Sequence, residues 1–213
     1  MESLGYKIIY EDDFPPAQSN FTADVISMRN QGVKMVYLIA VNAPDAAIFA
    51  NEAHQQGWKP DVWVAPVAYF AGYIQQSGGP DAVEGHYVNV GAARFLGEDA
   101  ASVPEVGLFS KWIKEVKSDF PIDQFSAYSW ANAAYFVKAL QAVGPKPTRK
   151  AVLAALANIH DFNDNGMMAP TDPGKKVPAS CWTMLQIQGG KYVRVDDPPT
   201  GYRCDGGYFH WHP

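Results

Sequence analysis

Residues 161–172 place oxygen-bearing side chains at the spacing of a calcium-binding loop. The members of the pattern share a side-chain oxygen or a tight turn, and they are Asp161, Asn163, Asn165, Gly166 and Asp172. Pro170 and Pro173 prevent the helix that should follow such a loop, and Asp replaces the Glu that binds calcium through both carboxylate oxygens. The sequence therefore favours an Asx-rich turn, and we predict no metal site.

Residues that could act as acid, base or nucleophile form no familiar catalytic pattern. The sequence contains no Gly-Lys-Ser/Thr phosphate loop, Gly-x-Ser-x-Gly elbow, His-Glu-x-x-His helix or Cys-x-x-Cys pair. Glu11, Asp12 and Asp13 form an acidic turn, which is far more often solvated than catalytic. His210 and His212 lie on a terminal tail and do not define a metal site. We predict no catalytic residues and no cofactor.

Helix and strand patterns alternate strictly between Phe21 and Pro66. Phe21, Val25 and Met28 fall on one helix face, so this helix should have one buried side. Residues 35–41 are apolar on both faces, which is typical of a strand covered by helices on both sides of a sheet. We predict that these residues form a central strand of a parallel sheet and not an edge strand.

A second helix follows this strand, and its first turn is well specified. Asn42 is placed to cap the helix, Pro44 suits the first turn, and Asp45 complements the positive end of the helix dipole. In open parallel sheets, ligands collect at the carboxyl ends of the strands. We therefore predict that residues 42–44, and residues 66–70 after the next strand, line a crevice.

Composition permits an ordinary globular core and argues against several classes of partner. The 213 residues include 47% hydrophobic and 18% charged side chains, so one or two folded domains are expected and disorder is not. The formal net charge is −5, and Lys and Arg are scattered, which disfavours nucleic acid or an anionic membrane as the main partner. No apolar run is long enough to cross a bilayer, and the first residues lack the pattern of an export signal.

Six segments, taken in order, resemble periplasmic binding proteins of the leucine/isoleucine/valine type, the ligand-receiving subunits of ABC importers. They are SNFTADVISMRNQG, KMVYLIAV, PDAAIFANEAHQQG, AVEGHYVNV, FSAYSWANAAYFVKALQAVG and CWTMLQIQGGKYVRV. The resemblance implies an α/β fold with a parallel sheet flanked by helices, namely the second lobe of a type 1 periplasmic binding protein plus the returning helices of the first lobe. It also implies a noncovalent mechanism, in which a small-molecule ligand bridges two lobes and the closed form docks on ABC permease subunits.

The resemblance further implies that most of the first lobe has no counterpart in this sequence. Residues 1–89 and 181–197 would form the C-terminal α/β lobe, incomplete at its start. Residues 90–180 would be a first-lobe helical segment without its sheet, and residues 198–213 a tail. Within the incomplete lobe, we predict a strand at residues 5–10.

Two helices of the first-lobe segment have apolar faces that would lack their sheet. The faces consist of Val106, Phe109, Trp112, Ile113 and Val116 on one helix, and Trp130, Ala134, Val137 and Leu140 on the next. Leaving several aromatic side chains in water would cost on the order of 10 kcal/mol. A larger precursor could supply the first lobe, two copies could exchange elements in a swapped homodimer, or the helices could refold onto the remaining sheet. We favour the first, with the chain as a truncated form; for a chain that is stable alone, we expect the swapped homodimer.

The resemblance also suggests ligand-binding residues, namely Asn42, Val67, Ala68, Tyr69, Phe70, Tyr87 and Trp130. Asn42 stands where leucine-type relatives place an aromatic contact, and Val67 and Ala68 lie near where amino-acid binders place the carboxylate for the ligand's ammonium. Because an unpaired buried ammonium would be costly, we predict a less polar ligand, such as an aromatic one. The aromatic candidates, with Tyr73 as a further one, have the alternative of belonging to the core.

Cys181 and Cys204 bracket a predicted hairpin of residues 182–188 and 191–195 joined by Gly189-Gly190. The even number of cysteines and the export implied by the resemblance favour a structural disulfide, and two buried free thiols are the alternative.

The family resemblance implies an extracellular or periplasmic location, and a membrane-anchored lipoprotein in the full-length form. The same fold could instead serve as the ligand-sensing domain of a signalling receptor. A small α/β enzyme is the least favoured reading, because no catalytic constellation is present.

Overall fold

The chain folds into two compact units in the computed structural model, which describes residues 4–39 and 41–205. Unit 1 comprises residues 1–89 and 185–193, and unit 2 comprises residues 90–184 and 194–213. The chain therefore passes from one unit to the other three times, at residues 89–90, 184–185 and 193–194.

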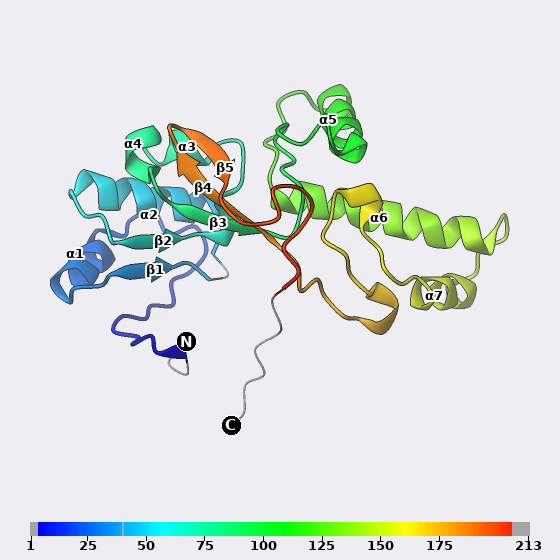
Figure 1. Ribbon diagram of the computed structural model, residues 1–213, viewed down its shortest axis with the longest axis horizontal. Coiled ribbons are helices and arrows are strands. Elements are labelled where there is room, and N and C mark those ends of the chain that lie inside the picture. Colours follow the sequence, from blue (N-terminus) through cyan, green and yellow to red (C-terminus); the bar gives the residue numbers. More distant parts are fainter. Residues whose placement is uncertain (1–3, 40, 206–213) are drawn as a thin grey trace. The chain divides into compact units, whose positions relative to one another are not determined.

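A five-stranded sheet within the described residues organises unit 1 (Figure 1). Its strands lie in chain order, and they are β1 (Met35–Tyr37), β2 (Val62–Val64), β3 (Tyr87–Val90), β4 (Thr183–Gln188) and β5 (Lys191–Arg194). β1 and β2 pair in parallel with Val36 opposite Trp63, and β2 and β3 pair in parallel with Val64 opposite Tyr87. The predicted α/β fold with a parallel sheet and flanking helices is confirmed.

The helices of unit 1 bury the faces that the sequence predicts. They are α1 (Thr22–Asn30), α2 (Ala43–Gln55), the 3₁₀ turn η2 (Pro66–Ala68), α3 (Tyr73–Gln76) and α4 (Pro80–Val83). Phe21, Val25 and Met28 are buried along α1, as predicted. The core continues through Phe49 of α2, whose ring centroid lies 5.2 Å from that of Phe21 and 5.0 Å from that of Trp63. Aromatic side chains therefore link both helices to the sheet.

Two strand predictions for unit 1 are wrong. β1 ends at Tyr37 instead of residue 41, and it is the first strand of the sheet and not a central one. Ile39 just beyond it is 69% exposed. Residues 5–10 form no strand. The apolar pattern of residues 35–41 shows only which faces of a strand are suited to burial. Whether the strand is central or at an edge depends on which other strands pair with its backbone, and the pattern does not report this.

Unit 2 consists mainly of helices and turns (Figure 1). They are α5 (Pro104–Val116), α6 (Gln124–Val143), α7 (Arg149–Ala157) and the 3₁₀ turns η3 (Asp164–Gly166) and η4 (Pro173–Lys175). A capping box starts α6, because Asp123 Oδ1 accepts from the Ser126 N–H at 2.8 Å and Ser126 Oγ accepts from the Asp123 N–H at 3.0 Å. The Tyr135 hydroxyl donates to the Leu156 carbonyl at 2.8 Å and so joins α6 to α7.

The last described residues of unit 2 are tied back to the chain by a disulfide. Cys181 and Cys204 are bonded, as predicted, and the neighbouring residues Trp182 and Arg203 pair as an antiparallel bridge. The predicted hairpin is present as β4 and β5. The Tyr202 hydroxyl also donates to the Gly166 carbonyl at 2.8 Å. This C-terminal segment therefore supports the turn η3.

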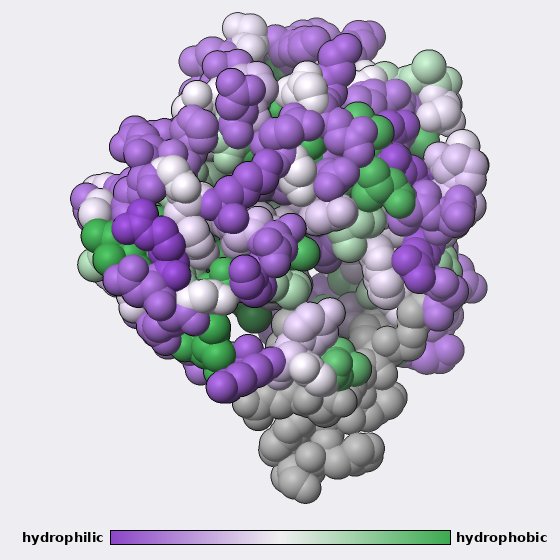
Figure 2. Space-filling view, turned by 60° about the vertical axis from the view of Figure 1, so that its left-hand side comes forward, coloured by the Kyte–Doolittle hydropathy of each residue, from purple (hydrophilic) through white to green (hydrophobic). Residues whose placement is uncertain are grey.

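Many large hydrophobic side chains remain on the surface. Figure 2 shows hydrophobic patches between hydrophilic residues on one face of the molecule. In unit 2, Val116 is 81% exposed, and Phe125 and Leu153 are more than half exposed. None of the described helices, however, is long and apolar enough to cross a membrane.

Candidate functional site

The sequence-predicted residues of unit 1 either follow the carboxyl ends of β1 and β2 or, in the case of Tyr87, begin β3. Tyr37, Val64 and Tyr87 lie in one register row across β1, β2 and β3. Asn42 follows shortly after β1, and residues 66–70 follow β2 directly. Carboxyl ends of parallel strands are where ligands of open α/β sheets collect.

The loop after β2 lies inside unit 1. Val67, Ala68, Tyr69 and Phe70 are all buried. The Tyr192 hydroxyl of β5 donates to the Ala68 carbonyl at 2.6 Å, and the rings of Tyr69 and Tyr192 meet edge to face with centroids 4.7 Å apart. These four side chains therefore hold the loop against the sheet and have little surface open to solvent.

Asn42 and Tyr87 are more accessible. Asn42 is exposed at the N-cap of α2, and Tyr87 is half-buried on β3. The sequence predicts that the Asn42 side chain caps α2, but this prediction is wrong, because the side chain forms no hydrogen bond with the helix backbone. Its Nδ2 donates instead to Asp45 Oδ2 at 3.2 Å. The buried Asp45 carboxylate also accepts from the Ala17 N–H at 3.2 Å. The acid nearest to Asn42 along α2 is therefore already engaged within the chain.

Tyr73 and His86 form a buried polar pair in unit 1. His86 Nδ1 lies 3.1 Å from the Tyr73 hydroxyl, and the His86 ring stacks on Trp63 with centroids 4.6 Å apart. Burial, with a smaller effect of Lys59, lowers the pKa of His86 to about 3, so the imidazole is neutral at physiological pH. Tyr73, a further aromatic candidate, is fully buried in this pair.

Trp130 lies on α6 in unit 2, where Glu105 fixes its indole. The Trp130 Nε1–H donates to Glu105 Oε1 at 2.8 Å, and the ring meets Phe109 edge to face at 5.8 Å. Glu105 Oε2 accepts from Asn165 Nδ2 at 2.9 Å. Sequence reasoning missed Glu105, although an acid in the first turn of a helix that begins with Pro104 is a common helix-start signal.

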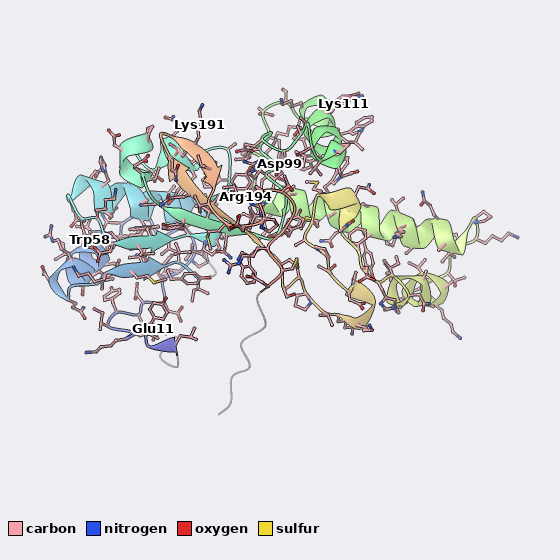
Figure 3. All side chains as sticks on the ribbon, in the orientation of Figure 1. Glu11, Trp58, Asp99, Lys111, Lys191 and Arg194 are labelled. Carbon is pink, nitrogen blue, oxygen red and sulfur yellow. A yellow bond between two sulfur atoms is a disulfide. The ribbon has the colours of Figure 1, made fainter. Side chains whose placement is uncertain are left out.

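A groove of about 470 Å³ lies along α5 and α6 in unit 2. Its lining is mostly aromatic and aliphatic, and it includes Phe109, Trp112, Val116, Phe120, Phe125 and Trp130. Lys111, labelled on α5 in Figure 3, places its ammonium 5.6 Å from the centre of the Trp112 ring. The predicted apolar faces of these two helices are therefore only partly covered.

The calcium-like loop uses its oxygens for contacts within the protein. Asp172 contacts His160 Nδ1 and pairs with Lys175 Nζ at 3.0 Å. The hydrogen bond with His160 lowers the pKa of Asp172 to about 2. Asp161, Asn165 and Gly166 have positive φ angles and form tight turns. No cluster of three acidic, His or Cys side chains suited to a metal occurs in residues 4–39 or 41–205.

The acidic turn of unit 1 is exposed. Glu11, labelled in Figure 3, lies on the N-terminal segment together with Asp12 and Asp13. His210 and His212 fall outside the described residues.

A family model described as "Periplasmic binding protein" matches residues 1–191. Solved structures with a similar fold include a leucine binding protein from Thermotoga maritima, with 18% identity, a TM-score of 0.64, and coverage of 86% of this chain and 49% of that chain. A branched chain amino acid ABC transporter protein from Thermus thermophilus with bound valine has 18% identity, a TM-score of 0.70, and coverage of 95% and 54%.

A fatty acid ABC transporter substrate-binding protein from Thermomonospora curvata has 19% identity, a TM-score of 0.65, and coverage of 84% of this chain and 46% of that chain. The chain thus spans about half the length of these solved structures. No curated protein matches the sequence.

Proposed function

Because the chain belongs to the periplasmic binding protein family, we propose that it is the solute-binding component of an ABC importer and takes a small, weakly polar ligand. The family is one of solute-binding proteins and not of enzymes, in agreement with the sequence-based prediction. The observation that supports the proposal is the register of the parallel strands, in which Tyr37 and Val64, the last residues of β1 and β2, lie level with Tyr87, the first residue of β3.

Some of the proposed ligand-binding residues are accessible and others are buried. Asn42 and Tyr87 are accessible and would touch the ligand with polar groups. Val67, Ala68, Tyr69 and Phe70 would form the rigid floor behind them, because they are buried and anchored by Tyr192. Trp130 is a further proposed aromatic contact; it lies in unit 2, where Glu105 holds its indole.

The proposed low polarity of the ligand follows from the charges around these residues. Residues 66–70 contain no carboxylate, and Asp45 already accepts hydrogen bonds from Ala17 and Asn42. A ligand ammonium placed there would lose its hydration without gaining a free partner, which is costly. Aromatic or aliphatic solutes avoid that cost.

We propose that a further α/β lobe covers the apolar groove on α5 and α6 in the functional protein. The groove exposes Trp112, Val116 and Phe120, which soluble proteins rarely leave in one open patch. A larger precursor is the favoured source of that lobe, and a swapped homodimer is the alternative. Intact mass and sedimentation of the protein from its source distinguish them, and a compact monomer of residues 1–213 that binds no hydrophobic dye would contradict both.

The importer role implies a place outside the cytoplasmic membrane. We propose an extracellular or periplasmic location, with a lipoprotein anchor in the full-length form, and ABC permease subunits as partners. Reconstituted transporter should show ligand-dependent stimulation of ATP hydrolysis when the full-length protein is added. A ligand-sensing domain would bind solute without that stimulation.

A thermal-shift screen of the full-length protein tests the ligand class. Weakly polar aromatic and aliphatic solutes should raise Tm, because a ligand that binds only the folded state stabilises it. Tyr87→Ala should reduce the shift, whereas Tyr6→Ala, which changes an exposed tyrosine of unit 1, should not. If leucine, isoleucine and valine were the only stabilising solutes, the proposed polarity would be wrong.

A further inference from the structure

Glu105 joins three elements of unit 2 through one carboxylate. Its Oε1 accepts from the indole N–H of Trp130 on α6 at 2.8 Å, and its Oε2 accepts from the amide of Asn165 in η3 at 2.9 Å. Glu105 itself lies in the first turn of α5, where the helix dipole favours a negative charge. The position of the Trp130 indole therefore depends on the charge environment of this carboxylate.

A second carboxylate is buried beside this junction. Asp164 precedes Asn165 in η3 and is only 4% exposed, and its Oδ2 has no hydrogen-bond partner among the described residues. The turn is fixed, because the Met167 N–H donates to the Asp164 carbonyl at 3.0 Å and the Tyr202 hydroxyl donates to the Gly166 carbonyl at 2.8 Å. The turn that carries Asp164 is therefore held by hydrogen bonds to two of its carbonyls.

Among the described residues, the charged group that acts on Asp164 is the Glu105 carboxylate of α5. The same carboxylate holds the neutral indole of Trp130 on α6. Tyr202, whose phenol pKa is raised by burial, donates to the carbonyl of Gly166, two residues after Asp164. The other charged groups of α6, Asp123 at its N-cap and Lys138, lie about two turns from Trp130 along the helix. Neither Asp164 nor Glu105 forms an ion pair within the described residues.

We propose that Glu105 and Asp164 form a proton-responsive clasp, in which one proton taken up from solvent by Asp164 secures the hold of Glu105 on the Trp130 indole. With both groups ionised, two carboxylates repel each other across the α5–η3 contact. With Asp164 protonated, that repulsion disappears, and the acid proton gives Asp164 a hydrogen-bond donor where it now has an unpartnered acceptor.

Electrostatics sets the pH at which the clasp responds. Burial and then the charge of Glu105 raise the pKa of Asp164 to about 6. Asp164 is therefore neutral at pH 5 and ionised at pH 7.5, within the range in which proteins outside the cytoplasm meet changing pH. Glu105 is a positioning residue here, since it acts on any ligand only through Trp130. In this respect the clasp rests on the proposed function and adds a regulatory input to it.

Fluorine NMR of protein labelled with 5-fluorotryptophan tests the clasp without any ligand. Trp130→Phe identifies the Trp130 resonance, and Trp112 on α5 serves as an internal reference. Between pH 4.5 and 8, the Trp130 resonance should shift with a one-proton midpoint near 6. In Asp164→Asn, which keeps the shape but cannot ionise, this shift should disappear, whereas Asp161→Asn in the same loop should leave it unchanged.

A second variant keeps the test decisive if Asp164→Asn does not fold. Glu105→Gln removes the negative charge beside Asp164 and should move the midpoint to lower pH, while a purely structural role for Glu105 would leave the midpoint in place. A Trp130 resonance that is independent of pH, or a shift that persists in Asp164→Asn, overturns the clasp. Because the readout is the indole itself, failure here leaves the proposed solute binding untouched, and failure of the solute screen leaves the clasp untouched.

Discussion

Helices of similar amphipathic sequence are buried to very different extents in the two units. In unit 1, seven of the 13 residues of α2 are buried, including Phe49. In unit 2, the 20-residue α6 buries only Ala127, Ala131 and Ala139, and α7 buries none of its residues. The difference follows from the sheet, which offers the helices of unit 1 a continuous apolar surface, whereas the helices of unit 2 have mainly one another.

The comparison shows that an apolar helix face indicates that the helix is suited to pack against an apolar surface. It does not show that such a surface is present. Phe125, Phe136 and Val137 of α6 are each about half exposed. The same kind of side chain in unit 1, such as Phe49 and Trp63, is at least 97% buried. Stability in unit 1 should therefore depend on individual side chains far more than stability in unit 2.

The largest expected effect is the loss of a core aromatic from unit 1. Trp63→Ala should lower the free energy of unfolding by about 3 to 5 kcal/mol, because it leaves a cavity and removes the stacking partner of His86. Leu153→Ala on α7, where the side chain is 54% exposed, should change it by less than about 0.5 kcal/mol. Urea unfolding of both variants measures the contrast, and equal losses would show that the two units are packed alike.

The disulfide should give the next largest effect. Cys181 and Cys204 lie 23 positions apart in the sequence. Reduction of their disulfide should lower the free energy of unfolding by about 3 kcal/mol, mainly because the unfolded chain gains conformational freedom. Hydrogen exchange should then rise first at residues 196–205 and at the turn η3, which Tyr202 supports. The Cys181→Ser/Cys204→Ser variant provides the control, since added reductant should not change its stability. A protein whose unfolding ignores reductant would contradict the structural role.

The two units should also respond to pH in opposite directions. The pKa of His86 in folded unit 1 is lowered to about 3 from the ordinary 6.5, so the unfolded chain binds a proton that the folded unit rejects. The contribution of neutral His86 to the stability of unit 1 is therefore fully present above about pH 6.5, and it is lost as the pH falls from 6.5 toward 3, by about 2 kcal/mol at pH 5. The pKa of Asp164 in unit 2 is raised to about 6 from 3.8, so its stabilising contribution exists below pH 3.8 and is lost as pH rises through 6.

Urea unfolding followed by separate Trp63 and Trp130 fluorine signals measures these two dependences in one sample. His86→Gln should flatten the response of unit 1, and His54→Gln, an exposed histidine on α2, should not. Parallel pH profiles for the two signals would refute the contrast.

The spacing of apolar residues correctly predicted those elements whose structure depends on residues close to one another in the sequence. The face of Phe21, Val25 and Met28 and the hairpin of β4 and β5 follow from local spacing and are present. The disulfide, expected from the even number of cysteines and the export that the resemblance implies, is present too. The position of β1 and the absence of a strand at residues 5–10 could not be read in this way. Strand pairing is set by distant backbone neighbours, and no local pattern reports whether they are available.

The sequence predicted which loops follow the parallel strands, but not the side-chain contacts that these loops make. The rule for carboxyl ends of parallel strands pointed to residues 42–44 and 66–70, which do follow β1 and β2. The burial of Tyr69 by Tyr192, and the hold of Glu105 on Trp130, depend on residues more than 20 positions apart. Their side-chain contacts exist only in the folded protein.

The smallest expected effect on the free energy of unfolding concerns the capping box at the start of α6, a helix that gains little stability from burial. Asp123→Ala removes the capping box with Ser126 and should lower the free energy of unfolding of unit 2 by about 1 kcal/mol. In unit 1, Asn42→Ala removes an N-cap residue whose side chain does not bond the helix backbone, so the loss should be only a few tenths of a kcal/mol. Hydrogen exchange of the first turns of α6 and α2 checks both substitutions. If Asn42→Ala lowered the free energy of unfolding by more than Asp123→Ala, the hydrogen bond from Asn42 to Asp45 would stabilise α2 more than the burial of the helix does. Unit 1 would then also depend on local contacts at its helix ends.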